Sequence, residues 1–443
     1  MIARLREVRL SRLALAAVAT LSGLATAVVI TTALGRTSAQ SAATEALHHP
    51  PLLVRVAATQ AAPKPAAAPA ADPGPAPAPV DTSAATDPGA QSSPPPATDN
   101  NASDSSDTSD PTTTDGTTTT PTTPATPQHK VGHVFEIALS TTSFEAAFGE
   151  QSVAHYLNTK LRPRGTFLGG YETLARAELP DYLAQISGQA PNDDTLADCL
   201  TYAEFPDKVE PNGAGLVPGA GCVYPNTITT LADQVTSAGK TWKAYVEDLD
   251  RNCVHPNSDA LDNVQLAGAG PDYATRHNPF IYFHSLLDLG GCDNGDGSLA
   301  KLKSDLHSSS KTATFSFLAP GACEDAAIAT CPDGQPAGLA GEDAFLHKWV
   351  PAILQSAAYK KDGVLIVTLA LTGATAPGGP VPTGALVLSR YAKVGKIVSA
   401  TYNPYSVLRS VEDLLGYKPL AHATSARSFV SAVLPEASAS AAK

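Results

Sequence analysis

Aromatic residues and cysteines are missing from the first 134 residues of this 443-residue chain. The segment from residue 50 to residue 128 instead holds 17 of the 37 prolines. A hydrophobic core needs aromatic and branched aliphatic side chains in a regular pattern, so this part of the chain is excluded as a folded domain. The sequence predicts a disordered Pro/Ala/Ser/Thr-rich stalk over 37–130, one folded domain over 131–430 and a disordered tail over 431–443.

Basic residues are also scarce. Lys and Arg number 30 against 42 Asp and Glu, the net charge is −12, and charged residues make up only 16% of the chain. Phosphate backbones are bound by clusters of Lys and Arg, and the sequence contains no stripe of this kind. Nucleic acid is therefore excluded as a partner.

A long apolar run, Leu13–Leu34, follows four arginines at the N-terminus. About 20 apolar residues span a bilayer as a helix, and positive charge before the run keeps that end cytoplasmic. Thr37-Ser38-Ala39 offers a small-residue cleavage site. Residues 1–36 are therefore predicted to be a signal peptide or an uncleaved membrane anchor. Either one exports the chain to the cell envelope or the extracellular space. The chain would contact the membrane through this helix if the helix stays uncleaved. The sequence does not identify a further partner or ligand.

Six cysteines lie in the predicted domain, and an even number in an exported domain predicts three disulfides. Fifteen pairings are available. The sequential pairing is expected because it closes short local loops, joining Cys199 to Cys222, Cys253 to Cys292 and Cys323 to Cys331. A zinc site is the alternative, but neither a C-x-x-C pair nor a His-rich spacing supports it.

Apolar runs predict buried strands at four places. Val134–Leu139 and Val364–Leu371 are continuous and contain β-branched residues, as do strands buried on both faces of a parallel sheet. Trp242–Val246 and Thr312–Leu318 are weaker runs of the same kind. Glu136 is the odd acid inside the first run, and we expect it either to face an edge or to have a partner.

Helical spacing is found between these runs. Thr227 is expected to cap a helix that ends at Gly239, and a second helix is predicted from Phe345 to Ala357. A third covers Val407–Leu415, with Asn403 and Pro404 at its start. Strands alternating with helices predict an α/β fold, a three-layer sandwich with a mostly parallel central sheet. Ligands bind such sheets at the carboxyl ends of the strands, so the chemistry is expected just after those ends.

Seven segments follow one another in an order that is typical of one family. They are His133–Gly149, Glu178–Gly188, Thr227–Asp248 (containing AGKTWKAYVED), His277–Phe280, Pro320–Asp325, Trp349–Leu371 and Tyr402–Gly416 (YNPYSVLRSVEDLLG). Together they resemble the bacterial phosphoesterase family of acid phosphatases and phospholipases C. The resemblance implies an alkaline-phosphatase-like fold and metal-assisted hydrolysis of phosphoric esters, in which a Ser or Thr attacks phosphorus.

Most residues that would carry this chemistry are replaced. Where the family has M-E-N-H-S-F, the matching positions start LSTT, and the attacking hydroxyl of H-P-S-L-P-N-Y is replaced by the carboxylate of Glu178. The family's N-D-M-H, T-F-D-E and Y-N-H-Y-S segments also lose polar residues. The substituted positions, apart from Glu178, are Ser140, Thr141, Thr142, Ala327, Ala370, Leu371 and Pro404.

Two of the expected polar residues remain, His277 and Asp325. Two residues cannot hold a hard divalent metal, so no metal or other cofactor is expected, although the family would use a divalent metal. His277 would contact phosphate or hydrogen-bond a turn, and Asp325 would act as an acid or form a turn. With Glu178, they are the candidate catalytic residues.

Three hypotheses follow from this pattern. The leading one is a catalytically degenerate phosphoesterase-like domain that binds or scaffolds at the cell envelope. The second is an active phosphoric-ester hydrolase with a rebuilt site, in which Glu178, Asp325 and His277 serve as acid, base and substrate contact. The third is a cleft for a neutral or apolar ligand, because Ala327, Ala370 and Leu371 replace polar or charged groups.

Overall fold

A seven-stranded sheet forms the centre of the domain in the computed structural model, which describes residues 129–263, 273–373, 378–435 and 437–438. The strands follow the order β4-β5-β2-β6-β7-β3-β8. Their bounds are β2 His133–Thr141, β3 Thr166–Leu168, β4 Trp242–Val246, β5 Phe315–Ala319, β6 Gly363–Leu371, β7 Ala385–Ser389 and β8 Ile397–Val398. The pairing is parallel except where β7 meets β6 and β3, so the sheet is mostly parallel, as predicted.

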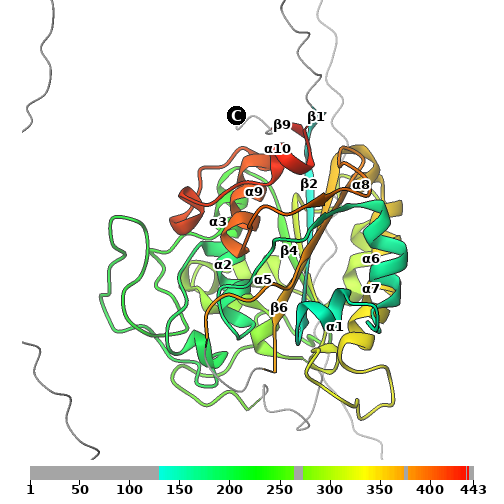
Figure 1. Cartoon of the computed structure of the whole chain (residues 1–443). Helices are drawn as coiled ribbons and strands as arrows, with labels where there is room; N and C mark the ends of the chain where they lie inside the picture. Colours follow the sequence, from blue (N-terminus) through cyan, green and yellow to red (C-terminus); the bar gives the residue numbers. More distant parts are fainter. Residues whose placement is uncertain (1–128, 264–272, 374–377, 436, 439–443) are drawn as a thin grey trace, which may run out of the picture. The chain divides into compact units, whose positions relative to one another are not determined.

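Helices cover both faces of this sheet (Figure 1). One layer contains α2 Leu179–Ser187, α3 Leu231–Ser237 and α9 Pro404–Leu415. The other contains α1 Phe144–Phe148, α6 Leu302–Asp305, α7 Gly338–Gln355 and α8 Ala357–Asp362. The three-layer α/β sandwich predicted from the alternation of strands and helices is therefore confirmed.

Several shorter elements complete the described part of the chain. The helices are α4 His284–Leu287, α5 Gly291–Gly295 and α10 Val430–Val433, and β1 His129–Lys130 pairs with β9 Ala437–Ser438. Single helical turns lie at Leu157–Leu161, Arg162–Arg164, Thr195–Ala197, Thr275–His277, Pro279–Tyr282, Leu299–Lys301, Ala322–Glu324 and Ala421–Thr424. The folded part extends past the expected limit at residue 430, since Val433 and Leu434 are buried.

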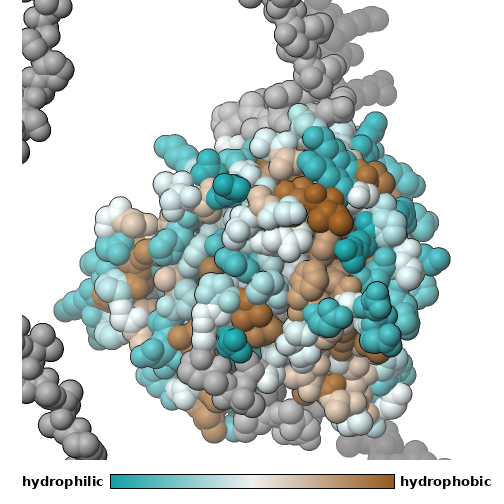
Figure 2. Space-filling model, in the orientation of Figure 1, coloured by the Kyte–Doolittle hydropathy of each residue, from teal (hydrophilic) through white to brown (hydrophobic). Residues whose placement is uncertain are grey.

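Alternation along β2 builds the two halves of the core. Val134 and Ala138 belong to the apolar cluster under α2 and α9, whereas Phe135, Ile137 and Leu139 belong to the cluster under α7. Successive side chains of a strand point to opposite faces, so a strand in mid-sheet must be apolar at every position to satisfy both layers. On the side shown in Figure 2, apolar residues are scattered among hydrophilic ones.

Several expected element boundaries are wrong. The helix predicted from Phe345 begins earlier, at Gly338. The helix expected to begin at Thr227 begins at Leu231, because Thr230 and Asp233 form a capping box. The helix predicted to reach Ala357 ends at Gln355, because Ser356 has an extended backbone and caps α8. The strand expected from Thr312 begins at Phe315.

The three disulfides have the sequential pairing that we expected. Cys199–Cys222, Cys253–Cys292 and Cys323–Cys331 have Cα–Cα distances of 5.9, 5.8 and 5.5 Å. No helix within the described ranges is long and apolar enough to cross a bilayer. The predicted membrane or signal segment at residues 13–34 and most of the stalk lie outside these ranges.

Glu136 contradicts the expectation of an edge position or a partner. It lies in β2 between β5 and β6, is fully buried, and neither carboxylate oxygen has a hydrogen-bond partner among the described residues. Burial raises the pKa of Glu136 to about 8, because a carboxylate loses its hydration there. The side chain is therefore neutral in the folded domain at pH 7.

The stability of the domain should fall as the pH rises from about 4.5 to about 8. In this window the unfolded chain releases the Glu136 proton while the folded domain retains it, which favours unfolding. Glu136→Gln removes this effect and should be more stable than wild type by on the order of 3 kcal/mol at pH 7, with a smaller difference at pH 5. Urea unfolding at both pH values measures the difference. The exposed Glu210→Gln serves as the control, and an E136Q difference that is the same at both pH values contradicts the prediction.

Candidate functional site: a buried ionic cluster at the strand ends

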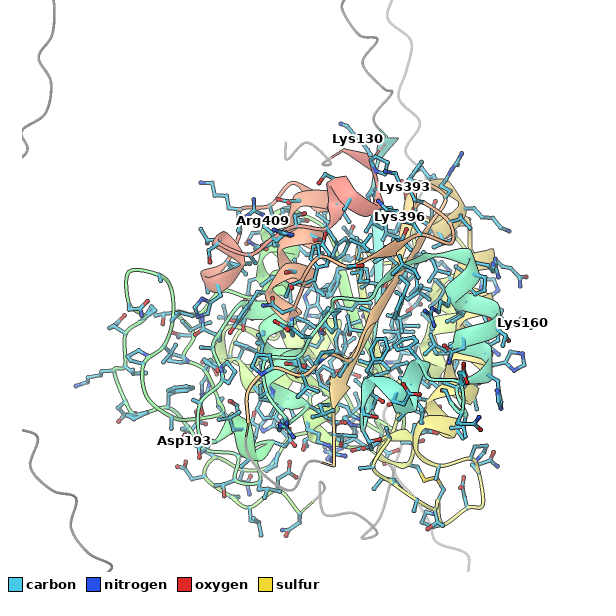
Figure 3. All side chains as sticks on the ribbon, in the orientation of Figure 1. Lys130, Lys160, Asp193, Lys393, Lys396 and Arg409 are labelled. Atoms are coloured by element: carbon cyan, nitrogen blue, oxygen red, sulfur yellow. A yellow bond between two sulfur atoms is a disulfide. The ribbon has the colours of Figure 1, made fainter. Side chains whose placement is uncertain are left out.

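The candidate site lies at the carboxyl ends of the three central strands, where the sequence analysis expected it. Because β2, β5 and β6 are parallel neighbours, the loops that follow Thr141, Ala319 and Leu371 emerge at one edge of the sheet. The N-terminus of α2 and the helical turn Thr275–His277 meet these loops. The labelled side chains of Lys130, Lys393 and Lys396 lie at the other end of the strands, near β1 (Figure 3).

Four charged or titratable side chains meet at this edge, and we call them the buried ionic cluster: Glu178, Arg276, His277 and Asp325. Arg276 donates from Nε to Glu178 Oε2 at 2.9 Å and from its terminal nitrogen Nη2 to Asp325 Oδ2 at 2.5 Å. His277 Nε2 lies 3.1 Å from the same Glu178 oxygen, and Nδ1 lies 3.0 Å from the carbonyl oxygen of Pro320. The cluster thus joins the start of α2, the turn at 275–277 and the loop after β5.

The charges of the cluster balance one another away from water. The side chains of Glu178, His277 and Asp325 are 1%, 3% and 4% exposed, and that of Arg276 is 11% exposed. Burial by itself would raise the pKa of Glu178, but the hydrogen bond and charge of His277 and the charge of Arg276 outweigh it and lower that pKa to about 2. The two carboxylates likewise raise the pKa of Arg276. The two ring nitrogens of His277 lie against two oxygen atoms, one of Glu178 and one of the Pro320 backbone.

Asp325 is fixed by further hydrogen bonds. Its Oδ1 accepts from Thr372 Oγ1 and from the backbone N–H of Ala327, each at 2.9 Å, which ties the loop after β5 to the end of β6. The disulfide between Cys323 and Cys331 closes the same loop. Asp325 is therefore held by its own surroundings as well as by Arg276.

A second buried acid, Glu342 of α7, engages the residue that stands at the family's glutamate position. The backbone N–H and the hydroxyl of Ser140 both donate to Glu342 Oε1 at 2.6 Å, and Ser140 Oγ accepts from Ala326 N at 2.9 Å. Burial raises the pKa of Glu342 well above its ordinary value, because desolvation outweighs these hydrogen bonds. Ser140 is 2% exposed, so its hydroxyl links α7 to the loop after β5 and does not face solvent.

The other substituted positions do not form a polar site. Thr141 donates its hydroxyl to the carbonyl of Ser143, and Thr142 is exposed. Ala370 and Leu371 are buried at the end of β6, beside Ser140 and Thr141. Pro404 is the first residue of α9, where a missing N–H is harmless, and Ala327 is exposed.

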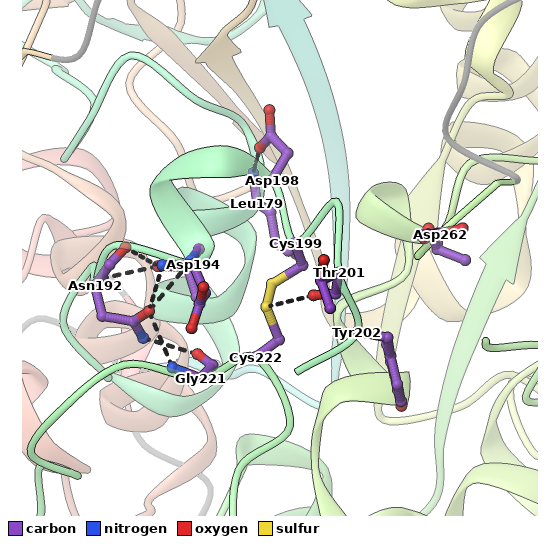
Figure 4. Close-up of a disulfide and its surroundings, with 12 residues drawn as sticks. Leu179, Asn192, Asp194, Asp198, Cys199, Thr201, Tyr202, Gly221, Cys222 and Asp262 are labelled. Carbon is purple, nitrogen blue, oxygen red and sulfur yellow. Dashed lines mark hydrogen bonds between the residues drawn. A yellow bond between two sulfur atoms is a disulfide. The ribbon is translucent and has the colours of Figure 1, made fainter. Parts of the chain in front are cut away.

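The loop that carries Asp198 supports the start of α2. Asp198 Oδ1 accepts from the backbone N–H of Leu179 at 2.9 Å, and the Cys199–Cys222 disulfide follows directly (Figure 4). Asn192, which precedes this disulfide loop in the chain, donates from its side chain to the carbonyl of Gly221, next to Cys222, at 3.0 Å. Burial and the neighbouring Glu178 charge raise the pKa of Asp198 to about 7.

The structure brings together the three candidate residues named from the sequence, and adds Arg276 and Glu342, which the sequence analysis did not name. Glu178, His277 and Asp325 come together with ligand atoms within 4.8 Å of one another. Arg276 was overlooked although it directly precedes His277. No local sequence pattern marks it, because its partners Glu178 and Asp325 are distant in the chain.

A divalent metal does not fit these residues as they stand. Glu178, His277 and Asp325 offer the oxygen and nitrogen atoms that such ions bind. However, both carboxylates already accept hydrogen bonds from Arg276, whose cationic side chain would repel a metal ion. A hollow of about 410 Å³ lies elsewhere, lined by the loop 204–210 and His284, and none of its lining residues belongs to the cluster.

The chain belongs to the phosphoesterase family, whose model matches residues 167–418, more than half of the chain. This match confirms the resemblance seen in the short segments. No curated protein matches the chain.

Solved structures similar to this chain come from the same broad class of fold. A protein of the alkaline phosphatase superfamily from Vibrio parahaemolyticus has 13% identity and a TM-score of 0.42, with 68% of this chain and 70% of that chain covered. A phosphonate monoester hydrolase from Silicibacter pomeroyi has 11% identity and a TM-score of 0.39, covering 69% and 77%. A putative sulfatase from Bacteroides thetaiotaomicron has 10% identity and a TM-score of 0.39, covering 71% and 76%.

Removing the disulfide beside Asp198 should destabilise the domain. Cys199→Ser/Cys222→Ser opens a loop of sequence separation 23 and should lower the free energy of unfolding by about 2–4 kcal/mol in urea. The matched control, Cys323→Ser/Cys331→Ser, opens a separation of only 8 and should cost about 1 kcal/mol less, since loop entropy grows with loop length. Equal losses in the two variants would argue against this account.

Glu178→Gln should destabilise the domain at neutral pH, because Arg276 and His277 lose their shared carboxylate. The expected loss is about 3–5 kcal/mol at pH 7. A depressed pKa stabilises the fold above the unfolded value of 4.5, and this contribution is lost as the pH falls toward 2. The gap between wild type and variant in urea unfolding should therefore shrink from pH 7 to pH 3. Glu150→Gln, at an exposed position, should behave like wild type at both pH values.

Proposed function

We propose that this member of the phosphoesterase family is catalytically degenerate and acts as an exported binding or scaffolding protein at the cell envelope. The observation that carries the proposal is the state of Glu178. It stands where the family has its attacking hydroxyl, it is fully buried, and its carboxylate is bound to Arg276 and His277. A carboxylate there repels an incoming phosphate and supplies no hydroxyl to attack phosphorus.

The hydroxyls around the strand ends support the same conclusion. Ser140, Thr141 and Thr372 donate to Glu342, Ser143 and Asp325 respectively, so each of these protons is already bound. Ser140 and Glu342 form a hydroxyl–carboxyl pair, in which the hydroxyl could be a nucleophile and the carboxylate its base. Burial raises the pKa of Glu342, however, and encloses both side chains, so the Ser140 hydroxyl has no access to a substrate.

Export and envelope binding rest on the sequence outside the described residues. The apolar run at 13–34 and the proline-rich segment that follows support a domain displayed on a stalk, anchored in the membrane if the run is not cleaved. A folded domain that has lost hydrolysis can still act by binding a ligand or partner at the cell envelope. Cell fractionation followed by detection of the full chain tests this location, and recovery in the cytosol would contradict it.

An active hydrolase with a rebuilt site is the second candidate. The observation in its favour is that Glu178, His277 and Asp325 lie within 4.8 Å of one another, as an acid, a base and a substrate contact require. Against it stands Arg276, which binds both carboxylates.

The purified protein should contain no stoichiometric metal and should hydrolyse neither a chromogenic phosphomonoester nor phospholipid above a blank. Elemental analysis and release of the chromophore measure the two properties. Asp325→Asn should give the same blank-level rates as wild type. Bound metal together with turnover that Asp325→Asn abolishes would establish the second candidate in place of the first.

A further inference from the structure

Arg276 supplies the positive charge between two buried carboxylates. Two buried carboxylates that share a site repel each other, and a fold that keeps both ionised must place positive charge between them. In this family a divalent metal ion would supply that charge. Here Arg276 lies between Glu178 and Asp325 and donates one hydrogen bond to each.

The backbone around Arg276 holds it in this place. Thr275, the preceding residue, donates its hydroxyl to Asp262. Asn278, two residues further on, donates to Asp296 at 3.0 Å and to the hydroxyl of Tyr273 at 3.3 Å. Anchors on both sides fix the direction in which the arginine side chain leaves the main chain.

The three remaining members of the cluster have the form of a metal site. His277 directs Nε2 toward Glu178 while Nδ1 lies against the carbonyl of Pro320, an arrangement that commonly orients a metal-binding histidine. Glu178 Oε1 is buried and has no hydrogen-bond partner among the described residues. Three protein ligands of this composition, two carboxylates and one imidazole, can bind Zn²⁺.

We propose that Arg276 is a built-in cation in the place of a divalent metal ion, and that its removal unmasks a Zn²⁺ site formed by Glu178, His277 and Asp325. Charge balance explains why the two cations exclude each other. The guanidinium group stays protonated at any pH at which the domain folds, so wild type keeps the site closed to metal. The proposal can fail independently of the proposed function, because it concerns metal affinity and not turnover.

Titration of Zn²⁺ into wild type and Arg276→Ala by calorimetry, with native mass spectrometry for stoichiometry, tests the proposal. Arg276→Ala should bind one equivalent of Zn²⁺ at least about tenfold more tightly than wild type. Arg276→Lys keeps a positive charge and should bind no better than wild type. The matched control is Arg409→Ala, which removes an arginine from a partly exposed pair with Asp413 and should gain nothing. Arg276→Ala/Asp325→Asn should lose the gain.

Three results would overturn the proposal. The first is Zn²⁺ binding by folded Arg276→Ala that is no tighter than binding by Arg409→Ala. The second is equally tight binding by the Arg276→Ala/Asp325→Asn double variant, and the third is uptake of one tight equivalent by wild type. If Arg276→Ala is poorly folded, its thermal melting with and without added Zn²⁺ tests the proposal instead. Added Zn²⁺ should raise its melting temperature and leave that of wild type unchanged, and the absence of such a rise counts against the proposal. Turnover by wild type would remove the proposed function without bearing on this inference.

Discussion

The parallel pairing of β2 with β5 and β6 is the constraint on which the rest of the domain depends. All nine residues of β2 are in register with β6, and both faces of the strand are buried. Parallel neighbours bring their carboxyl ends to one edge, so Ser140 at the end of β2 meets the loops that carry Asp325 and Thr372. The fold therefore brings the same positions together at this edge whichever side chains occupy them.

The fold accommodates buried acidic side chains at this edge and in the adjoining core by two different physical means. Glu178 keeps its charge because Arg276 and His277 surround it. Burial instead raises the pKa of Glu136 to about 8 and raises the pKa of Glu342 well above its ordinary value. The first arrangement stabilises the fold above about pH 4.5, and the second stabilises it at low pH. Both contributions are present together in mildly acidic solution, where we expect this part of the domain to be most stable.

The sequence predicted the elements that depend on local pattern, but not the contacts between residues that are far apart in the chain. The central strands, the start of α9 and the three disulfides follow from apolar runs, caps and short loops. Arg276 could not be recognised in this way, since its partners Glu178 and Asp325 lie 98 and 49 residues away in the chain. The prediction for Glu136 was wrong for a different reason. Its carboxylate oxygens have no hydrogen-bond partner among the described residues, and burial keeps the side chain neutral instead.

A cation that belongs to the chain differs physically from one that is bound. A metal ion stabilises its site by an amount that depends on its free concentration, because binding and folding are linked by mass action. Arg276 is always present at its site and cannot be removed by dilution or by chelators. For a domain that works outside the cytoplasm, as we propose, the buried carboxylates at the strand ends remain neutralised without any supply of metal. The exchange of an ion for an arginine that we propose would preserve the fold of the site and give up the Lewis acid that metal-assisted hydrolysis requires.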